Sequence, residues 1–194
     1  MKILVLLMVV LCECISSAIA QTNFYDQLAD SAYVLTKQNV RYDPSYVVIA
    51  YPNGDVPANK GVCTDVIVRA YRKLGIDLQK EVHVDMVANF DQYPKIWGLS
   101  KPDPNIDHRR VQNLMTFFSR KGTVLKNSIV PEDYSPGDIV CWNLDGKATH
   151  IGIVSKRRSI DGKRNLIIHN IGEGQILEDC LFKWKIIGHY RYKK

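Results

Sequence analysis

Helical periodicity and strand-like alternation occupy separate halves of this chain, and that separation restricts its fold more than any other feature. Apolar residues recur at helical spacing as far as Gly122. Beyond Gly122, short β-branched and apolar runs are divided by turn signals such as Pro136-Gly137 and Asp161-Gly162. Helices first and strands afterwards predict an α+β domain in which N-terminal helices pack on an antiparallel sheet.

The individual elements follow from the same patterns. Helices are expected from Phe24 to about Lys37, over 61–75, over 82–90, and from a cap at Asp107 to Gly122. Three prolines and one glycine between residues 93 and 105 predict a surface loop. The run 46–51, closed by a turn at 52–55, is typical of a short strand. Later strands are expected at 123–125, 138–143, 149–156, 165–171 and 185–192.

The segment 61–75 holds the first candidate for chemistry. Gly61 opens this expected helix and Gly75 can end it as a C-terminal cap. Cys63 then falls in the first turn, where free backbone N–H groups and the helix dipole stabilise a thiolate. Such a position can lower a cysteine pKa from about 8.5 to between roughly 3.5 and 7.5. Cys63 is therefore a candidate nucleophile, and the alternative is a small buried hydrophobic residue.

The strand half supplies candidate bases for that thiol. A cysteine nucleophile needs a histidine within hydrogen-bond reach, and a third polar group orients the histidine. His150 is the expected base, and His169 or Asn170 is the expected third residue. If Asp161-Gly162 is a two-residue turn, His169 shares a face with His150 and Asn170 points the other way, so His169 is preferred.

The same register leaves a gap between the two histidines. It separates His150 from His169 by about four residues along the strands, or roughly 13 Å. A wider loop or a β-bulge must therefore bring them together. The remaining histidines are expected to be ordinary core or surface residues: His83, His108 and His189.

The first 20 residues predict a signal peptide. Lys2 gives a positive n-region, residues 3–11 an apolar h-region too short to span a membrane, and residues 18–20 a small-x-small cleavage site. We expect export to the periplasm or the extracellular space, cleavage before Gln21, and a single domain over 21–194. No stable insertion into a membrane is expected.

The formal net charge of +6 survives that cleavage, because Lys2 and Glu13 leave together. A basic protein favours anionic partners such as cell-wall polymer, a membrane surface or nucleic acid. No nucleic-acid-binding motif is recognisable and the basic residues are scattered, so a solvated surface explains the charge best. No nucleic-acid partner is expected.

Cleavage leaves Cys63, Cys141 and Cys180, an odd number that leaves at least one thiol free or paired between chains. A bridge between Cys141 and Cys180 would make Cys63 the free thiol, and the alternative is that all three are buried as thiols. No two cysteines or histidines stand at close ligand spacing, so no metal site and no cofactor is expected.

Several motifs in order resemble those of the NlpC-type, papain-like cell-wall cysteine peptidases. They are Cys63 at a helix start, Pro136-Gly137-Asp138-Ile139-Val140, His150-Ile151-Gly152-Ile153 and Ile168-His169. More closely, the chain resembles a family of secreted bacterial proteins called domain of unknown function 1287. That resemblance rests on Gly61-Val62-Cys63-Thr64-Asp65-Val66, Asn105-Ile106-Asp107-His108-Arg109-Arg110-Val111 and His150-Ile151-Gly152.

The resemblance implies a papain-like fold and hydrolysis of an amide bond in peptidoglycan stem peptides. Cys63 would be the nucleophile, His150 the general base and acid, and His169 the orienting residue, with the backbone N–H of Cys63 in the oxyanion hole. The chain departs from the NlpC pattern in three ways. Thr64-Asp65 stands in place of Ser-Gly, the interval from His150 to His169 is longer, and a large insertion separates the helix from the strands.

Candidate substrate-binding residues complete the set: Tyr51, Asp65, His108, Arg109 and Asn170. Asp65 either caps the helix start or binds an amine or orders the loop 51–55. His108 and Arg109 belong either to a capped helix start with solvated charges or to a basic rim that grips substrate carboxylates.

The sequence therefore predicts an exported cysteine amidase or endopeptidase whose partner is peptidoglycan or a wall-derived peptide. A non-catalytic wall-binding or inhibitory protein of the same fold is one alternative. An acyltransferase that uses the same thiol is another, and the oligomeric state stays open.

Overall fold

The computed structural model describes residues 23–146 and 148–194, so the expected signal peptide at 1–20 lies outside the described residues. Helices fill the first half, as predicted: α2 (Phe24–Leu35), α3 (Cys63–Arg72), α4 (Leu78–Ala88) and α5 (Val111–Lys121). Short 3₁₀ turns are η1 (Phe90–Gln92), η2 (Asp107–Arg109) and η3 (Pro131–Asp133). Within the described ranges, no helix is long and apolar enough to cross a membrane.

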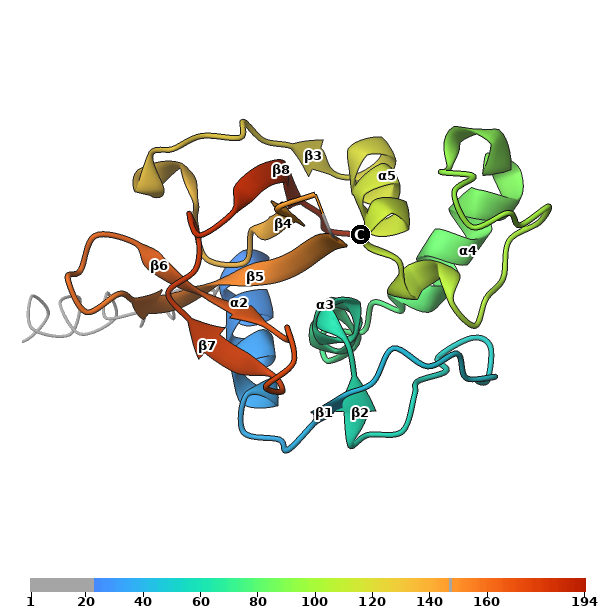
Figure 1. Cartoon of the computed structure of the whole chain (residues 1–194), viewed down its shortest axis with the longest axis horizontal. Helices are drawn as coiled ribbons and strands as arrows, with labels where there is room; N and C mark the ends of the chain where they lie inside the picture. The colour runs from blue at the N-terminus through green and yellow to red at the C-terminus, as the bar shows by residue number, and fades with distance from the viewer. Residues whose placement is uncertain (1–22, 147) are drawn as a thin grey trace, which may run out of the picture.

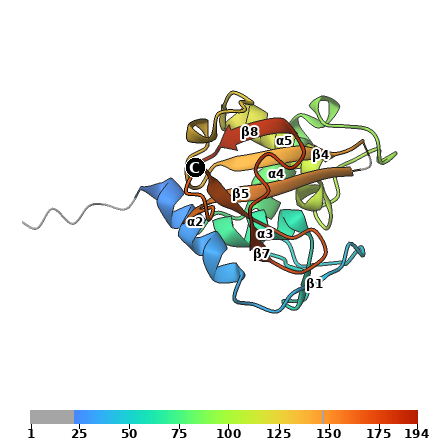
Figure 2. The ribbon, with the colours of Figure 1, turned by 60° about the vertical axis from the view of Figure 1, so that its left-hand side comes forward.

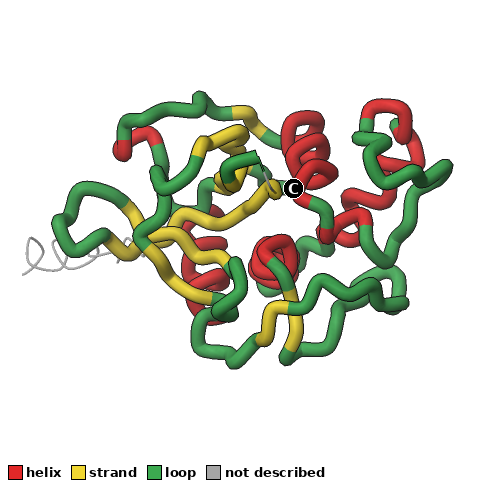
Figure 3. Tube along the Cα trace, in the orientation of Figure 1, coloured by secondary structure: helices red, strands yellow, loops and turns green. Residues whose placement is uncertain are grey.

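The second half forms one antiparallel sheet. Its strands are β3 (Thr123–Val124), β4 (Ile139–Leu144), β5 (Ala148–Arg158), β6 (Asn165–His169), β7 (Ile176–Glu178) and β8 (Lys185–Arg191), in the order β3-β8-β4-β5-β6-β7. A separate two-residue parallel pair joins β1 (Arg41–Tyr42) to β2 (Lys60–Gly61). The α+β prediction is confirmed, and Figure 3 shows the strands of the sheet gathered on the left with α2 behind them, and α4 and α5 on the right.

Helix α3 lies at the centre of the arrangement, seen end-on in Figure 1 between the sheet and the pair α4 and α5. It contacts α2, α4, β5 and η2, so nearly every side of it is covered. Residues Cys63–Tyr71 are all buried. Each fully buried aliphatic residue such as Ile67 stabilises the fold by about 1.5–3 kcal/mol. The expected amphipathic helix is therefore a core helix.

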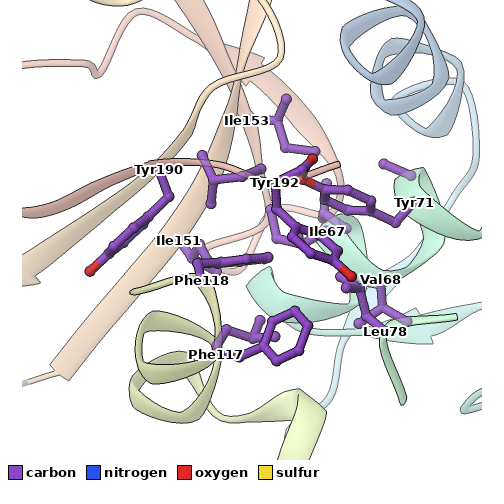
Figure 4. Close-up of a cluster of buried hydrophobic side chains, with 14 of the residues drawn as sticks. Ile67, Val68, Tyr71, Leu78, Phe117, Phe118, Ile151, Ile153, Tyr190 and Tyr192 are labelled. Atoms are coloured by element: carbon purple, nitrogen blue, oxygen red, sulfur yellow. Dashed lines mark hydrogen bonds between the residues drawn. The ribbon is translucent and has the colours of Figure 1, made fainter. Parts of the chain in front are cut away.

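Both faces of the sheet are covered, and successive side chains of each strand point alternately to one face and the other. Ile139 and Cys141 of β4 face the helices with Ile151 and Ile153 of β5, in the large core that Figure 4 shows around Tyr71. Val140 and Trp142 face the other way, with Val154, Ile167, Cys180 and Leu181. Figure 2 shows β4, β5 and β8 side by side above α2 and α3.

Two local expectations are wrong. Residues 46–51 form no strand, because Val48 is exposed and the N–H of Ile49 is bound by the side chain of Asn105 rather than by a strand partner. Asp107 does not cap α5; its carboxylate accepts the N–H of Asp103, and α5 begins after Arg110. Strand β7 was not expected.

Candidate functional site

The start of α3 is held by a buried ion pair. Asp65 accepts the N–H of Val62 at 2.6 Å, which satisfies one of the free donors at the helix start. The guanidinium of Arg109 grips the same carboxylate at 2.9 and 3.0 Å and also binds the carbonyl of Ser45. Asp65 and Arg109 are both buried. Asp65 therefore caps the helix, and together with Arg109 it fixes the backbone on which Cys63 stands.

The sulfur of Cys63 lies against the backbone of β5. The N–H groups of Ile151, Thr64 and Cys63 itself act on it and lower its pKa. Burial outweighs them, since Cys63 is only 7% exposed, and raises the pKa to about 12, with Asp65 adding to the rise. The expectation of a lowered pKa is wrong for the resting protein, because desolvation of the thiolate costs more than these N–H groups recover.

Cys63 lies at an edge of β5, against the backbone of Ile151, and among the described residues no hydrogen bond joins its sulfur to His150. Strand β6 pairs with β5 only from Ile153 onward, so the stretch around Ile151 is left for Cys63. Ile151 faces the helices, whereas its neighbour His150 is paired with Trp142 and faces the opposite side of the sheet. The sulfur thus approaches the backbone next to His150, and the imidazole lies on the face of the sheet that Trp142 occupies.

A β-bulge brings the two histidines together. Arg158 pairs with Asn165, as a two-residue turn predicts, but Val154 pairs with Ile167 instead of His169. The bulge thus moves β6 by two residues relative to β5, an even number that keeps side chains on their expected face. Nε2 of His150 lies 2.9 Å from Nδ1 of His169.

Glu178 completes a chain of polar side chains. Its Oε2 lies 3.0 Å from Nε2 of His169, and Lys183 binds its other oxygen at 2.9 Å. The Lys183 hydrogen bond lowers the pKa of Glu178, with His169 adding to the effect, so the carboxylate only accepts hydrogen bonds. His169 must then carry its proton on Nε2 and accept from His150 at Nδ1. This order leaves Nδ1 of His150 without a proton.

Both histidines are buried and neutral. Burial, with a smaller contribution from the neighbouring His169, lowers the pKa of His150 to about 3. Trp142 and Trp184 flank His150, with ring centroids 5.9 and 6.1 Å away. Burial also lowers the pKa of His169, although Glu178 opposes that shift. The pair carries no charge near neutral pH.

Asn170 lies against a different partner. Its amide donates to the carbonyl of Gly61 at 3.2 Å, and its oxygen accepts the N–H of Gly172. The structure therefore places His169, and not Asn170, against His150. Asn170 fixes the backbone just before Cys63.

The expected basic rim is not formed. Arg109 is committed to Asp65, and His108 is buried with its pKa lowered to about 4, first by burial and then by Arg109. The substrate contacts expected of Asp65 and Arg109 are therefore replaced by a structural ion pair. Tyr51 is exposed and packs edge-on against His83, with the two ring centroids 4.9 Å apart.

Two neighbours of the site escaped the sequence analysis. Glu178 lies on the unexpected strand β7, so no pattern pointed to it. Tyr42 lies close enough to Cys63 for the thiol to contribute to the raised pKa of the phenol, after burial. Tyr42 is 38% exposed.

The three cysteines in the described ranges are free and buried. Cys141 belongs to the core on the helix side of the sheet, and Cys180 to the core on the opposite side. The sheet separates them, so the Cys141–Cys180 bridge that the sequence left open is not formed.

Comparison with known proteins places the chain in a family. It is 51% identical over 172 residues to "Uncharacterized protein YijF" of Escherichia coli (strain K12), a match that covers 89% of this chain and 83% of that protein. Among solved structures, NlpC1 from Trichomonas vaginalis is similar at 16% identity and a TM-score of 0.49. That match covers 91% of this chain but only 47% of the other chain. A family model matches residues 29–192, and the chain belongs to the family described as domain of unknown function, DUF1287.

Proposed function

We propose that this protein is an exported cysteine amidase or endopeptidase that cleaves amide bonds of peptidoglycan stem peptides through a thioester. The observation that carries the proposal is the array in which Cys63 lies against β5 beside His150, and His150 is linked through His169 to Glu178. The ordered motifs around Cys63, His150 and His169 and their resemblance to cell-wall peptidases support the choice of substrate.

The first step follows from the neutral resting state. A buried thiol and a buried imidazole do not form a stable ion pair, so proton transfer accompanies attack. Nδ1 of His150 takes the proton from Cys63 while the sulfur bonds to the substrate carbonyl carbon. The carbonyl oxygen becomes an oxyanion, and the backbone N–H of Cys63 at the helix end is its expected donor.

The polar chain supports the charge that develops. Protonated His150 donates from Nε2 to His169, and His169 donates from Nε2 to the carboxylate of Glu178. Hydrogen bonds thus connect the positive charge on His150 to the negative charge on Glu178. His150 then gives its proton to the departing amine as the C–N bond breaks and the thioester remains.

Water completes the cycle. His150 takes a proton from water, the hydroxide oxygen attacks the thioester carbon, and the proton returns to the sulfur as the C–S bond breaks. The acid product leaves, and Cys63 is again a thiol. With an amine in place of water, the same thioester gives acyl transfer.

Mass spectrometry of peptidoglycan fragments tests the proposal. Purified protein should release new products that Cys63→Ser and His150→Ala do not, while both variants keep the circular dichroism and melting cooperativity of the parent. Cys141→Ser is the matched control, since it replaces a buried thiol outside the array. Identical fragment profiles from the parent and both variants would remove the proposal.

A second candidate is a wall-binding or inhibitory protein without turnover. The burial of Cys63 and its raised pKa favour it, because a sealed thiol is typical of packing. This protein would sediment with insoluble peptidoglycan and leave it uncut, and Cys63→Ser would bind as well as the parent.

A further inference from the structure

Three metal-binding side chains converge on the face of the sheet opposite α3. His169, Glu178 and Cys180 each offer a ligand atom, and these atoms all lie within 4.8 Å of one another. Nε2 of His169 is 3.0 Å from Oε2 of Glu178 and 3.6 Å from Sγ of Cys180. Cysteine and histidine spacings in the sequence do not indicate this group, because its third member is Glu178.

Two of the separations are close to those between the ligands of a tetrahedral ion. Zinc bonds of about 2.0–2.1 Å to nitrogen, about 2.0–2.2 Å to oxygen and about 2.3 Å to sulfur give N–O and N–S separations of roughly 3.3 and 3.6 Å. The observed distances are 3.0 and 3.6 Å. One nitrogen, one oxygen and one sulfur donor favour zinc-class ions over magnesium or calcium.

The surroundings suit such a site as well. His169 and Cys180 are buried, whereas the Glu178 side chain is 29% exposed and opens the group to solvent. Lys183 holds the other oxygen of Glu178, and His150 holds the other nitrogen of His169. Such outer partners orient ligands in metal sites.

We propose that His169, Glu178 and Cys180 bind a zinc-class divalent ion, and that the bound ion switches off the pair Cys63 and His150. The site stands on the ligand group alone, and the switching rests on the proposed function. Three protein ligands leave a fourth position of the tetrahedron for water.

Proton positions give the switch its mechanism. Without metal, Glu178 keeps the proton of His169 on Nε2 and leaves Nδ1 of His150 bare. A metal ion on Nε2 moves that proton to Nδ1 of His169, which then donates to Nε2 of His150. His150 must carry its own proton on Nδ1 and can no longer accept one from Cys63. Only the proton of the Cys180 thiol leaves the protein, as the S–metal bond forms.

Cobalt(II) titration tests the site. The chain carries Cys12→Ser and Cys14→Ser in every sample and is kept reduced with a non-thiol reductant. We expect one equivalent of Co²⁺ to produce thiolate-to-cobalt charge-transfer absorption and to release one proton. Cys180→Ser should abolish the band. Glu178→Gln should weaken binding by more than about 100-fold, since loss of even an outer partner costs 10–100-fold.

Two controls make the assignment specific. Asp179→Asn removes one negative charge between Glu178 and Cys180 without removing a ligand, so it should weaken binding far less than Glu178→Gln does. Cys63→Ser should also keep the band. Absence of the band in the parent, or its loss in Cys63→Ser rather than Cys180→Ser, would overturn the site.

Nitrogen NMR of labelled histidine tests the switch without any need for activity. Filling the site should convert Nδ1 of His150 from the unprotonated to the protonated chemical shift, and an unchanged His150 would overturn the switch.

In an active preparation, Zn²⁺ should stop hydrolysis by the parent but not by Cys180→Ser. Equal inhibition of both would also overturn the switch. A protein without hydrolytic activity would defeat the proposed function, while cobalt absorption and NMR still decide the site and the switch.

Discussion

Nε2 of His150 and Nδ1 of His169 lie 2.9 Å apart because a bulge in β5 cancels two residues of strand offset. His169 is thereby the only described side chain that hydrogen bonds the His150 ring, and through Glu178 it fixes which nitrogen of His150 is free. His169 is therefore expected to orient His150 without binding substrate, so its loss should affect kcat and not KM.

Replacing His169 with alanine should lower kcat by about 10²–10⁴-fold, the range of a general-base contribution, and leave KM nearly unchanged. Nε2 of His150 would lose its hydrogen-bond acceptor. The ring could then carry its proton on Nδ1, where it cannot accept one from Cys63. Steady-state kinetics on a defined stem peptide measures the change, with His83→Ala as the control for loss of a histidine elsewhere. A loss that appears only in KM would show that His169 binds substrate instead.

Replacing Glu178 with glutamine should lower kcat less, by about 10–100-fold, because the chain keeps its hydrogen bonds but loses its charge. Glu178 now opposes the fall in the His169 pKa, so its removal should lower that pKa further. NMR titration of His169 checks the direction. Asp179→Asn should change neither kcat nor the His169 titration, and an equal effect of both variants would point to general charge loss.

Sequence patterns predicted most of the helices and strands, because these elements show regular hydrophobic periodicity and are bounded by glycine, proline or other turn residues. Cys63 at the start of α3 and His150 on β5 follow from helical spacing and strand alternation. Alternation also favoured His169 over Asn170 for the face shared with His150. Local periodicity was enough for these positions.

Contacts between distant segments could not be predicted in the same way. The pairing of Asp65 with Arg109 joins residues 44 positions apart, and nothing local distinguishes it from two solvated charges. Burial of Cys63 depends on how α3, β5 and Tyr42 pack together. That burial raises the pKa of Cys63, whereas the helix dipole alone would lower it. Strand β7 is only three residues long, too short for alternation to reveal Glu178.

Breaking the pair of Asp65 and Arg109 should destabilise the fold strongly. Asp65→Asn or Arg109→Leu leaves one charge buried without its partner, a change worth about 3–5 kcal/mol. Urea unfolding should show the loss as a lower midpoint with an unchanged slope. The double variant Asp65→Asn/Arg109→Leu should lose less than the sum of the two, and simple additivity would contradict a direct coupling.

Cys63 should resist alkylation in the folded, resting protein. A thiol with a pKa of about 12 instead of about 8.5 holds about 3,000-fold less thiolate at neutral pH. Iodoacetamide labelling followed by peptide mass spectrometry should therefore be slow at pH 7 and rise steadily to pH 9. Rapid labelling below pH 8 would mean that the resting thiol is already ionised and that His150 carries its proton before substrate arrives.

Acid should destabilise the protein through His108. Its pKa is about 4 in the folded protein, because burial and Arg109 oppose the charged form, against about 6.5 in the unfolded chain. The unfolded state binds the extra proton first, so stability is present above pH 6.5 and is lost as pH falls toward 4, by about 3 kcal/mol. Asp77 and Asp55 also face His108, and they moderate the shift. Urea midpoints at pH 7 and pH 4.5 should therefore differ less in His108→Leu than in the parent, whereas Gln112→Leu, which removes no titrating group, should keep the parental difference. An unchanged pH dependence in His108→Leu would show that other buried groups, such as His150, dominate the acid response.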